Sequence, residues 1–204
     1  MRPRRSRALE RWLLRLRERY LLDYSFVHIN KTGGTSVVVA LGLPFGHLTA
    51  REKIEQLGRE RWDGRFTFAF VRNPWDRVAS HYRYRWETNQ TRLKERGVDF
   101  PDWVRLAYRE REPVYRDNPK MFMPQMEWLV DDRGRLAVTF VGRFERLAED
   151  FAEICRKIGR TEVRLPHLKS TARQDYRLLY DDDTREIVAR CFERDIDEFG
   201  YRYE

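Results

Sequence analysis

The sequence predicts an α/β fold in which a parallel β-sheet is covered by helices on both faces. Three short apolar runs rich in β-branched and aromatic residues indicate buried strands at residues 24–29, 65–71 and 136–142. Helix-like apolar spacing follows each run, and this alternation is typical of parallel sheets. The sequence contains no internal repeat, low-complexity tract or Gly/Ser-rich linker, so we expect one domain spanning residues 1–204.

The first 20 residues carry most of the net positive charge of the chain. They hold eight arginines and two glutamates, a net charge of +6 out of a formal +8 for the whole sequence. Apolar side chains recur among them at helical spacing, at Leu9, Trp12, Leu13, Leu16 and Tyr20. We expect residues 1–22 to form a basic amphipathic helix that packs with its arginines outward. The alternative is contact with nucleic acid, an anionic membrane surface or an acidic polymer. Among these partners we expect no nucleic acid and retain peripheral membrane contact as a candidate.

The helices after the first two strands have recognisable starts. After the first strand and its loop, TSVVVALGL at residues 35–43 is apolar enough for a buried helix despite its valines. A capping box formed by Thr49 and Glu52 begins the next helix, which ends at Gly58. After the second strand, Pro74 begins a further helix.

The second half of the chain is less regular. Residues 100–110 have a helical pattern, whereas residues 112–124 contain three prolines and are expected to form a loop. After the third strand, an apolar stripe starting at Phe144 indicates a helix that ends at Gly159. A similar stripe predicts a final helix over residues 187–199.

The composition excludes several classes of protein. No stretch approaches the roughly 18 apolar residues of a membrane span, and the first residues lack the apolar block of a secretory signal. We therefore expect a cytoplasmic protein. Cys155 and Cys191 are too few for a disulfide framework and lack metal-ligand spacing. Each lies on the apolar face of a predicted helix, which favours buried free thiols.

In sheets of this kind, ligands bind where strands end and loops lead into helices. The first such loop is HINKTGGTS (28–36). Gly33 and Gly34 permit main-chain conformations that other residues avoid and allow close approach to an anion. The Thr-Ser pair after them begins a helix whose N-terminal amides favour a phosphate-like group, and Lys31 adds an ammonium group. The nucleotide-binding pattern GxxxxGK[ST] is absent. The alternative is a tight turn with a solvated lysine.

The loop after the second strand contains a second set of anion-binding groups. Arg72 lies at the strand end, and Ser80 follows eight residues later on the first turns of the next helix. A guanidinium can hold a phosphate through two hydrogen bonds, and a hydroxyl can donate another. Taken alone, these two residues are explained equally well as a helix cap and a surface charge. Together with the first loop, they indicate a ligand with two separated anionic groups.

Both segments resemble those of a known family. HINKTGGTS is similar to the 5′-phosphosulfate-binding loop, and FVRNPWDRVASHY to the 3′-phosphate-binding segment, of sulfotransferases that use 3′-phosphoadenosine 5′-phosphosulfate (PAPS). The chain most resembles the branch of carbohydrate O-sulfotransferases and their short bacterial relatives. FVGRFERLAEDF, LPHLKST and IDEFGYRY extend the similarity over most of residues 24–203. The resemblance implies a three-layer α/β sandwich with a central parallel sheet, akin to P-loop nucleotide kinases, and no required metal.

The resemblance also assigns roles to individual residues. It implies a cradle for the 5′-phosphosulfate made by Lys31, Thr32, Gly33, Gly34, Thr35 and Ser36. It places Arg72 and Ser80 on the 3′-phosphate. Further phosphate contacts are expected near LPHLKST, from Lys169, Ser170 and Arg173. The donor would leave as 3′,5′-adenosine bisphosphate, with Lys31 offsetting the charge on the bridging oxygen.

Sulfuryl transfer by in-line displacement also needs a base that takes the acceptor proton. His47 resembles the histidine base of some carbohydrate sulfotransferases, and an unperturbed histidine pKa of about 6.5 suits that role. The alternative for His47 is a loop residue that packs near a helix start. Glu52 and Glu55 are fallback bases, because other branches of the family use glutamate. Of the remaining histidines, His28 lies within a predicted strand and His81 on a helix face turned away from Ser80. His167 is expected in a loop over the nucleotide.

The acceptor is the least defined partner. MFMPQMEWL (121–129) resembles an acceptor-lining region in which Gln125 and Trp128 would meet a sugar, although core packing explains the segment equally well. We expect a carbohydrate-like hydroxyl acceptor, such as an acidic glycan, with a lipid or small-molecule alcohol as the alternative. Two other functions remain open. One is a nucleotide-dependent kinase on the same fold, and the other is a noncatalytic polyanion-binding module built on the N-terminal arginines.

Overall fold

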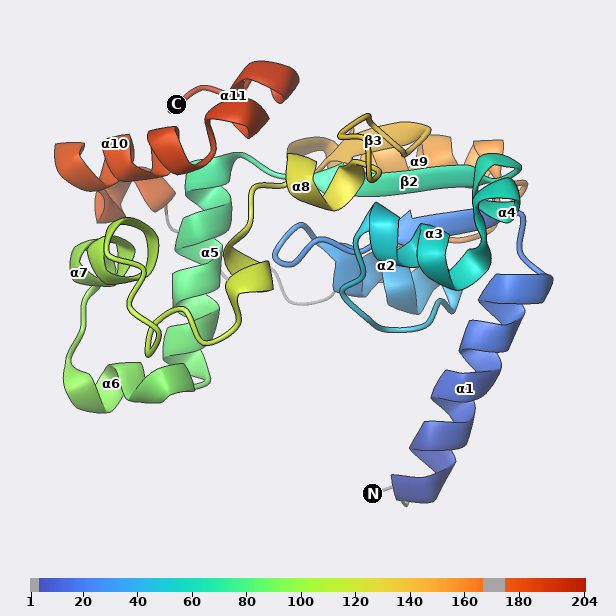
Figure 1. Cartoon of the computed structure of the whole chain (residues 1–204), viewed down its shortest axis with the longest axis horizontal. Helices are drawn as coiled ribbons and strands as arrows, with labels where there is room; N and C mark the ends of the chain where they lie inside the picture. The colour runs from blue at the N-terminus through green and yellow to red at the C-terminus, as the bar shows by residue number, and fades with distance from the viewer. Residues whose placement is uncertain (1–3, 167–174) are drawn as a thin grey trace. The chain divides into compact units, whose positions relative to one another are not determined.

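The computed structural model describes residues 4–166 and 175–204 and divides into two compact units (Figure 1). Unit 1 comprises Met1–Val71 and Trp128–Ser170, and unit 2 comprises Arg72–Glu127 and Thr171–Glu204. Unit 1 holds the β-sheet, whereas unit 2 is built from helices.

Within the described residues, the sheet of unit 1 has three parallel strands, in the order β1 (Tyr24–Val27), β2 (Phe66–Val71) and β3 (Phe140–Arg143). Phe68 of β2 lies opposite Phe26 on one side and Phe140 on the other. Because neighbouring strands run in the same direction, their carboxyl ends meet at one edge of the sheet. The parallel sheet with flanking helices confirms the predicted α/β class.

One face of the sheet packs against two helices, α2 (Gly34–Leu41) and α9 (Leu147–Lys157). Alternate strand side chains point to the same face, and here these are aromatic: Phe26, Phe68 and Phe70 are at most 3% exposed. Burying a side chain of this size stabilises the fold by about 1.5–3 kcal/mol. The predicted helices after the first and third strands are therefore present and cover this core.

Two further helices of unit 1 are α3 (Ala50–Leu57) and α4 (Arg59–Asp63). The capping box that begins α3 at Thr49 is formed as predicted. The sequence pattern did not predict α4. It is held by Trp62, which is 2% exposed and whose indole N–H donates to the carbonyl oxygen of Ala137 at 2.7 Å.

The third strand begins later than predicted. Residues 136–142 were expected to be extended, but β3 starts at Phe140 because Val130 and Leu136 form an antiparallel bridge that closes a turn. The side chain of Asp131 stabilises that turn by accepting hydrogen bonds from the main-chain N–H groups of the two arginines at 133 and 135.

The N-terminal helix α1 (Arg4–Tyr20) is present, but its expected packing is wrong. Its apolar side chains were expected to pack against the domain, yet four of them are more than half exposed: Leu9 (56%), Trp12 (55%), Leu13 (51%) and Tyr20 (58%). The helix instead meets the rest of unit 1 through Glu18, which is buried in an ion pair with Lys53.

The helices of unit 2 surround a core that includes the buried side chains of Trp75, Trp103, Phe122 and Phe192. These helices are α5 (Pro74–Glu87), α6 (Leu93–Arg96), α7 (Phe100–Val104), α10 (Asp182–Cys191) and α11 (Glu193–Phe199). The chain passes from unit 2 back to unit 1 within the short helix α8 (Met126–Leu129), between Glu127 and Trp128.

Of two helices predicted in unit 2, one begins as expected and the other is interrupted. Pro74 begins α5 as expected, with the side chain of Asn73 accepting a hydrogen bond from the N–H of Trp75. The single helix expected over residues 187–199 is wrong, because the chain leaves helical geometry at Phe192 (φ −121°) and continues as α11. An apolar stripe does not reveal such a break, since Phe192 is buried on the same face.

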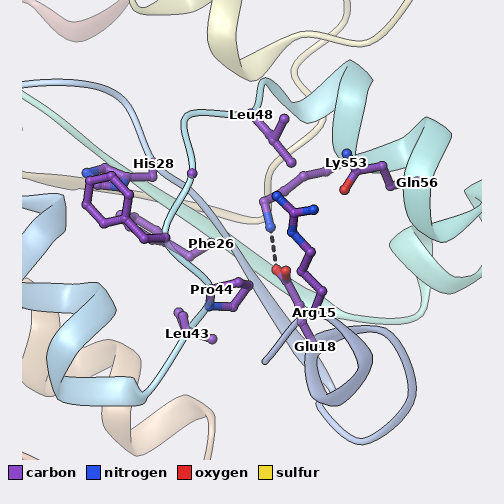
Figure 2. A pocket seen from close by; sticks show the side chains of 11 residues that line it. Arg15, Glu18, Phe26, His28, Leu43, Pro44, Leu48, Lys53 and Gln56 are labelled. Carbon is purple, nitrogen blue, oxygen red and sulfur yellow. Dashed lines mark hydrogen bonds and ion pairs between the residues drawn. The ribbon is translucent and has the colours of Figure 1, made fainter. Parts of the chain in front are cut away.

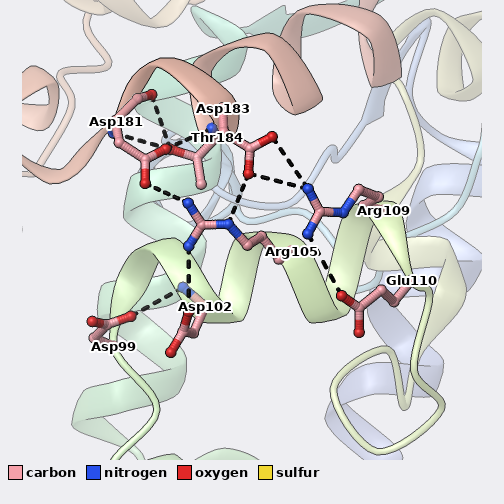
Figure 3. A network of polar contacts seen from close by, with 8 residues as sticks. All are labelled: Asp99, Asp102, Arg105, Arg109, Glu110, Asp181, Asp183 and Thr184. Carbon is pink, nitrogen blue, oxygen red and sulfur yellow. Dashed lines mark hydrogen bonds and ion pairs between the residues drawn. The ribbon is translucent and has the colours of Figure 1, made fainter.

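Charged side chains connect α10 to the π-helical stretch Arg105–Arg109 that continues α7 (Figure 3). Arg105 donates to the carboxylates of Asp181 and Asp183, and Arg109 donates to Asp183. Asp181 also caps α10 by accepting from the N–H of Thr184 at 2.7 Å. The hydrogen bonds from Thr184, with Arg105 next in importance, hold the pKa of Asp181 at about 2.

The two cysteines are free thiols. Cys155 lies on the buried side of α9, as predicted, whereas Cys191 is half-buried. Burial raises the pKa of both thiols, which favours the unreactive protonated form.

Candidate functional site

The loop between β1 and α2 is tightly curled. Lys31 (φ 67°) and Gly33 (φ 79°) both adopt the left-handed conformation, which is uncommon for a residue with a side chain. The N–H of Ser36 donates to the carbonyl oxygen of Gly33 at 3.0 Å, and the hydroxyl of Thr32 donates to that of Ile29 at 3.0 Å. Left-handed residues in such loops are typical of main-chain anion-binding concavities.

Neither glycine of this loop has room for a side chain. A Cβ atom on Gly34 would lie 2.1 Å from Cδ2 and 2.4 Å from Nε2 of His28. A Cβ atom on Gly33 would lie 2.8 Å from Cδ2 of Leu147, at the start of α9. The loop therefore packs directly on the end of β1 and on the first turn of α9, which fixes its path.

His28 is a structural residue, as the sequence analysis expected. It is 3% exposed and is surrounded by the rings of Phe26, Phe45 and His47. Burial, followed by the charges of His47 and Lys53, lowers the pKa of His28 to about 3. The imidazole is therefore neutral at physiological pH. Its Nδ1 atom is buried and has no hydrogen-bond partner among the described residues.

His47 is held against this loop by the main chain of His28. Its Nδ1 atom lies 2.9 Å from the carbonyl oxygen of His28, and the two ring centroids are 4.3 Å apart. A carbonyl oxygen only accepts hydrogen bonds, so Nδ1 of His47 must carry the proton. The lone pair of the neutral ring is then on Nε2, which makes Nε2 the basic nitrogen.

The two fallback bases are placed differently. The carboxylate of Glu52 accepts from the N–H of Thr49 at 2.7 Å and closes the capping box of α3. Glu55 is exposed and lines an arginine-rich cavity in unit 1. Glu52 is therefore engaged in capping α3.

The second predicted segment lies in unit 2 and begins with a buried arginine. Arg72 is 7% exposed, and its guanidinium donates to both carboxylate oxygens of Asp76, from Nε at 2.9 Å and from Nη2 at 2.7 Å. Ser80 is half-buried one further helix turn along α5. Asp76 and Ser80 are four residues apart on α5 and so lie on the same side of it, whereas Arg72 precedes the helix and reaches back to Asp76.

The main chain of Arg72 is also fixed. Its N–H donates to Oε1 of Gln125 at 2.8 Å, and its carbonyl oxygen accepts from Nε2 of Gln125 at 2.8 Å. Gln125 is held in turn by Asp195, which accepts from the N–H of Gln125 at 2.7 Å. Sequence reasoning missed both partners of Arg72. The spacing of Arg72 and Asp76 was a readable signal, whereas the link to Gln125 spans more than 50 residues.

The predicted sugar contacts are wrong. Gln125 and Trp128 were expected to meet an acceptor, but both are 0% exposed. The amide of Gln125 is occupied by Arg72 and Asp195, each within unit 2. The alternative interpretation, core packing, holds for this segment.

His81 does not add to the site. His81 is 5% exposed and packs in the core of unit 2, with ring centroids 5.6 Å from Trp103 and 4.8 Å from Phe122. His167, Lys169, Ser170 and Arg173 lie outside the described residues. In residues 4–166 and 175–204, no group of three or more His, Cys, Asp or Glu side chains is placed to hold a metal ion.

A cavity of about 390 Å³ in unit 1 is lined mainly by arginines. Its lining residues are Arg51, Ile54, Glu55, Arg59, Asp132, Arg133 and Arg135. The side chain of Asp131 lies behind it and is 2% exposed, and hydrogen bonds from neighbouring arginines hold its pKa at about 2 despite burial. Arg51, the second residue of α3, lies four residues after His47 and donates to the carbonyl oxygen of Asp131. Sequence reasoning did not identify this cavity, because its residues come from two distant segments.

A second cavity, of about 70 Å³, lies where α1 meets the body of unit 1 (Figure 2). It is lined by His28 and Phe45 and by the buried ion pair between Lys53 and Glu18. This small cavity links the loop region to the N-terminal helix.

Comparisons with known proteins agree with this architecture. A model of the sulfotransferase family matches residues 23–202. A protein of Archaeoglobus fulgidus, described as uncharacterized, is 30% identical over 124 residues, which cover 60% of this chain and 91% of that protein. No solved structure matches the chain significantly. The match to the family extends from the start of β1 almost to the C-terminal residue and includes both segments described above. The chain belongs to the sulfotransferase family.

Proposed function

We propose that the protein transfers a sulfuryl group from PAPS to a hydroxyl of a carbohydrate-like acceptor. Membership of the family supports sulfuryl transfer in general. The observation that carries the more specific proposal is the loop after β1. Its left-handed Lys31 and its two glycines without room for a side chain form a turn suited to a phosphosulfate group.

The two anionic ends of PAPS match the two predicted segments. Residues Lys31 to Ser36 would hold the 5′-phosphosulfate, and Arg72 with Ser80 would hold the 3′-phosphate. Each segment follows a strand in the sequence, since His28 follows β1 and Arg72 follows β2. The buried pair with Asp76 fixes the orientation of the Arg72 guanidinium. That geometry orients the arginine before a ligand arrives.

The reaction is an in-line displacement at sulfur. The acceptor oxygen forms a bond to sulfur while the bond from sulfur to the bridging phosphate oxygen breaks, and 3′,5′-adenosine bisphosphate departs. Lys31 offsets the negative charge that develops on the bridging oxygen. Nε2 of His47 takes the acceptor proton, because Nδ1 is already protonated and bound to the carbonyl of His28.

The acceptor is proposed to be an acidic glycan. Four arginines line the cavity of about 390 Å³, and their guanidinium groups match carboxylate or sulfate groups in geometry and charge. The cavity is lined by Arg51, Ile54 and Glu55 of α3, a helix that begins three residues after His47. A chain bound there would have its neighbouring residues close to the proposed base.

The test is transfer of radioactive sulfate from labelled PAPS to an acidic polysaccharide and to a neutral one, each with and without a chelator. We expect label in the acidic polysaccharide and no loss with the chelator. Arg133→Ala should raise KM for the acidic acceptor and leave donor binding unchanged. Absence of label in every acceptor, or magnesium-dependent transfer of phosphate from a nucleoside triphosphate, would overturn the proposal.

A further inference from the structure

The N-terminal helix α1 presents an apolar surface to solvent. Four side chains form this exposed face: Leu9, Trp12, Leu13 and Tyr20, each between 51% and 58% exposed. They lie three to four residues apart or at multiples of that spacing, so they share one side of the helix. Single exposed apolar residues are common, but an aligned set is typical of a binding surface.

The body of unit 1 holds α1 from the opposite side. Glu18 is nine residues from Leu9, and at about 100° per residue the two side chains point in opposite directions. Glu18 is 7% exposed and pairs with Lys53 (Figure 2). Arg17 donates to the carbonyl oxygen of Gly42 at 3.1 Å. Arg65 donates to the carbonyl oxygen of Glu18 at 2.7 Å. The last turns of α1 are therefore fixed, and its buried contact, Glu18, lies on the side opposite the exposed face.

The sequence of the N-terminal helix is strongly basic. Residues 1–20 contain eight arginines and two glutamates, and one of those glutamates, Glu18, is already paired with Lys53. Arg15 and Arg19 are exposed on α1, and the guanidinium of Arg61 lies 5.3 Å from the ring centroid of Tyr20. A surface that covers this face must accept apolar side chains and supply negative charge.

An anionic lipid bilayer meets both requirements. Helices with Trp, Leu and Tyr on one side and arginines on the other lie in the plane of the headgroups, with the apolar side chains at the acyl boundary. Within the described residues, no helix is long and apolar enough to cross a membrane. We propose that the exposed face of α1 docks the protein on bilayers that contain anionic lipids.

The test is flotation of the full chain with vesicles. One vesicle preparation is pure phosphatidylcholine, and the other is an equimolar mixture of phosphatidylcholine and phosphatidylglycerol. The test variant is Trp12→Ser/Leu13→Ser. The control is Leu178→Ser, which removes an apolar side chain that is 75% exposed in unit 2. Circular dichroism and thermal melting of each variant check that it is folded.

We expect the wild type and Leu178→Ser to bind the anionic vesicles and to bind pure phosphatidylcholine at least about tenfold more weakly. Trp12→Ser/Leu13→Ser should bind the anionic vesicles at least about tenfold more weakly than the wild type, because it loses the apolar insertion. Failure of the wild type to float with anionic vesicles would overturn the proposal. So would unchanged binding by the double variant, or a wild-type dimer that the double variant dissociates, since a second copy would then cover the face.

Discussion

Nδ1 of His47 donates a hydrogen bond to the main-chain carbonyl oxygen of His28 across 2.9 Å. His28 directly follows β1 and its ring packs on Gly34, so this single bond ties the proposed base to the strand that carries the donor loop. It also determines the tautomer of His47 and makes Nε2 the basic nitrogen.

Substitution of His47 should separate binding from turnover. We expect His47→Ala to lower kcat by about 10²- to 10⁴-fold, the usual contribution of a general base, and to leave the affinity for 3′,5′-adenosine bisphosphate unchanged. Steady-state kinetics and calorimetry measure the two quantities. Glu55→Ala is the matched control for a fallback base. Turnover that survives in His47→Ala and fails in Glu55→Ala would assign the base to the glutamate.

The contact between Gly34 and His28 predicts a specific rescue. Gly34→Ala should lower the free energy of unfolding by about 1–3 kcal/mol, because its Cβ would lie 2.1 Å from the His28 ring. Gly46→Ala is the control, since a Cβ there has no heavy atom within 4 Å. In a His28→Ala background, the cost of Gly34→Ala should be smaller. Urea denaturation of the wild type, Gly34→Ala, His28→Ala and the double variant measures the cost of Gly34→Ala in both backgrounds. Equal costs would rule out the contact with His28 as the cause.

His28 should make stability depend on pH. Its pKa is about 3 in the folded protein and about 6.5 in the unfolded chain. Between these pH values the unfolded state binds a proton that the folded state does not. Neutral His28 therefore costs the folded state nothing above about pH 6.5, and the free energy of unfolding decreases as the pH falls from there toward 3. We expect the wild type to lose about 2 kcal/mol more than His28→Leu between about pH 7.5 and about pH 5. Urea denaturation at the two pH values measures the difference, and equal losses would contradict it.

The fork between Arg72 and Asp76 predicts that lysine cannot replace arginine. Arg72→Lys keeps the charge but cannot make the two parallel hydrogen bonds to Asp76. We expect 3′,5′-adenosine bisphosphate to bind at least about tenfold more weakly, in line with the loss of one charged hydrogen bond. Arg190→Lys is the control, because its side chain is 79% exposed. Unchanged nucleotide affinity in Arg72→Lys would remove Arg72 from the donor site.

Local sequence patterns predicted the elements that depend on local chemistry. The capping box at Thr49, the helix start at Pro74 and the buried strand 65–71 are all present, because each is encoded within a few residues. The start of β3 was misplaced because Val130 and Leu136 pair across a turn, which a pattern of apolar residues does not show.

In the candidate site too, features encoded within one loop were predicted, and features that join distant segments were not. The glycine pair and Lys31 were recognisable from a single loop. Gly33 has the left-handed conformation that favours glycine, whereas Gly34 is required by the closeness of the His28 ring. The support of Arg72 by Gln125 and the arginine-lined cavity were not predicted, because they join segments far apart in the sequence. The packing of α1 was misjudged because an amphipathic pattern does not specify what covers the apolar side.

Binding of 3′,5′-adenosine bisphosphate, measured by isothermal titration calorimetry, tests the central claim most directly. The wild type should bind it more tightly than adenosine 5′-monophosphate, because only the bisphosphate has two anionic ends. Lys31→Ala should weaken binding of the bisphosphate by at least about tenfold, through loss of a charged contact, whereas Lys94→Ala on the exposed side of α6 should not. No binding by the wild type, or equal binding by Lys31→Ala, would contradict a phosphosulfate site at residues 28–36.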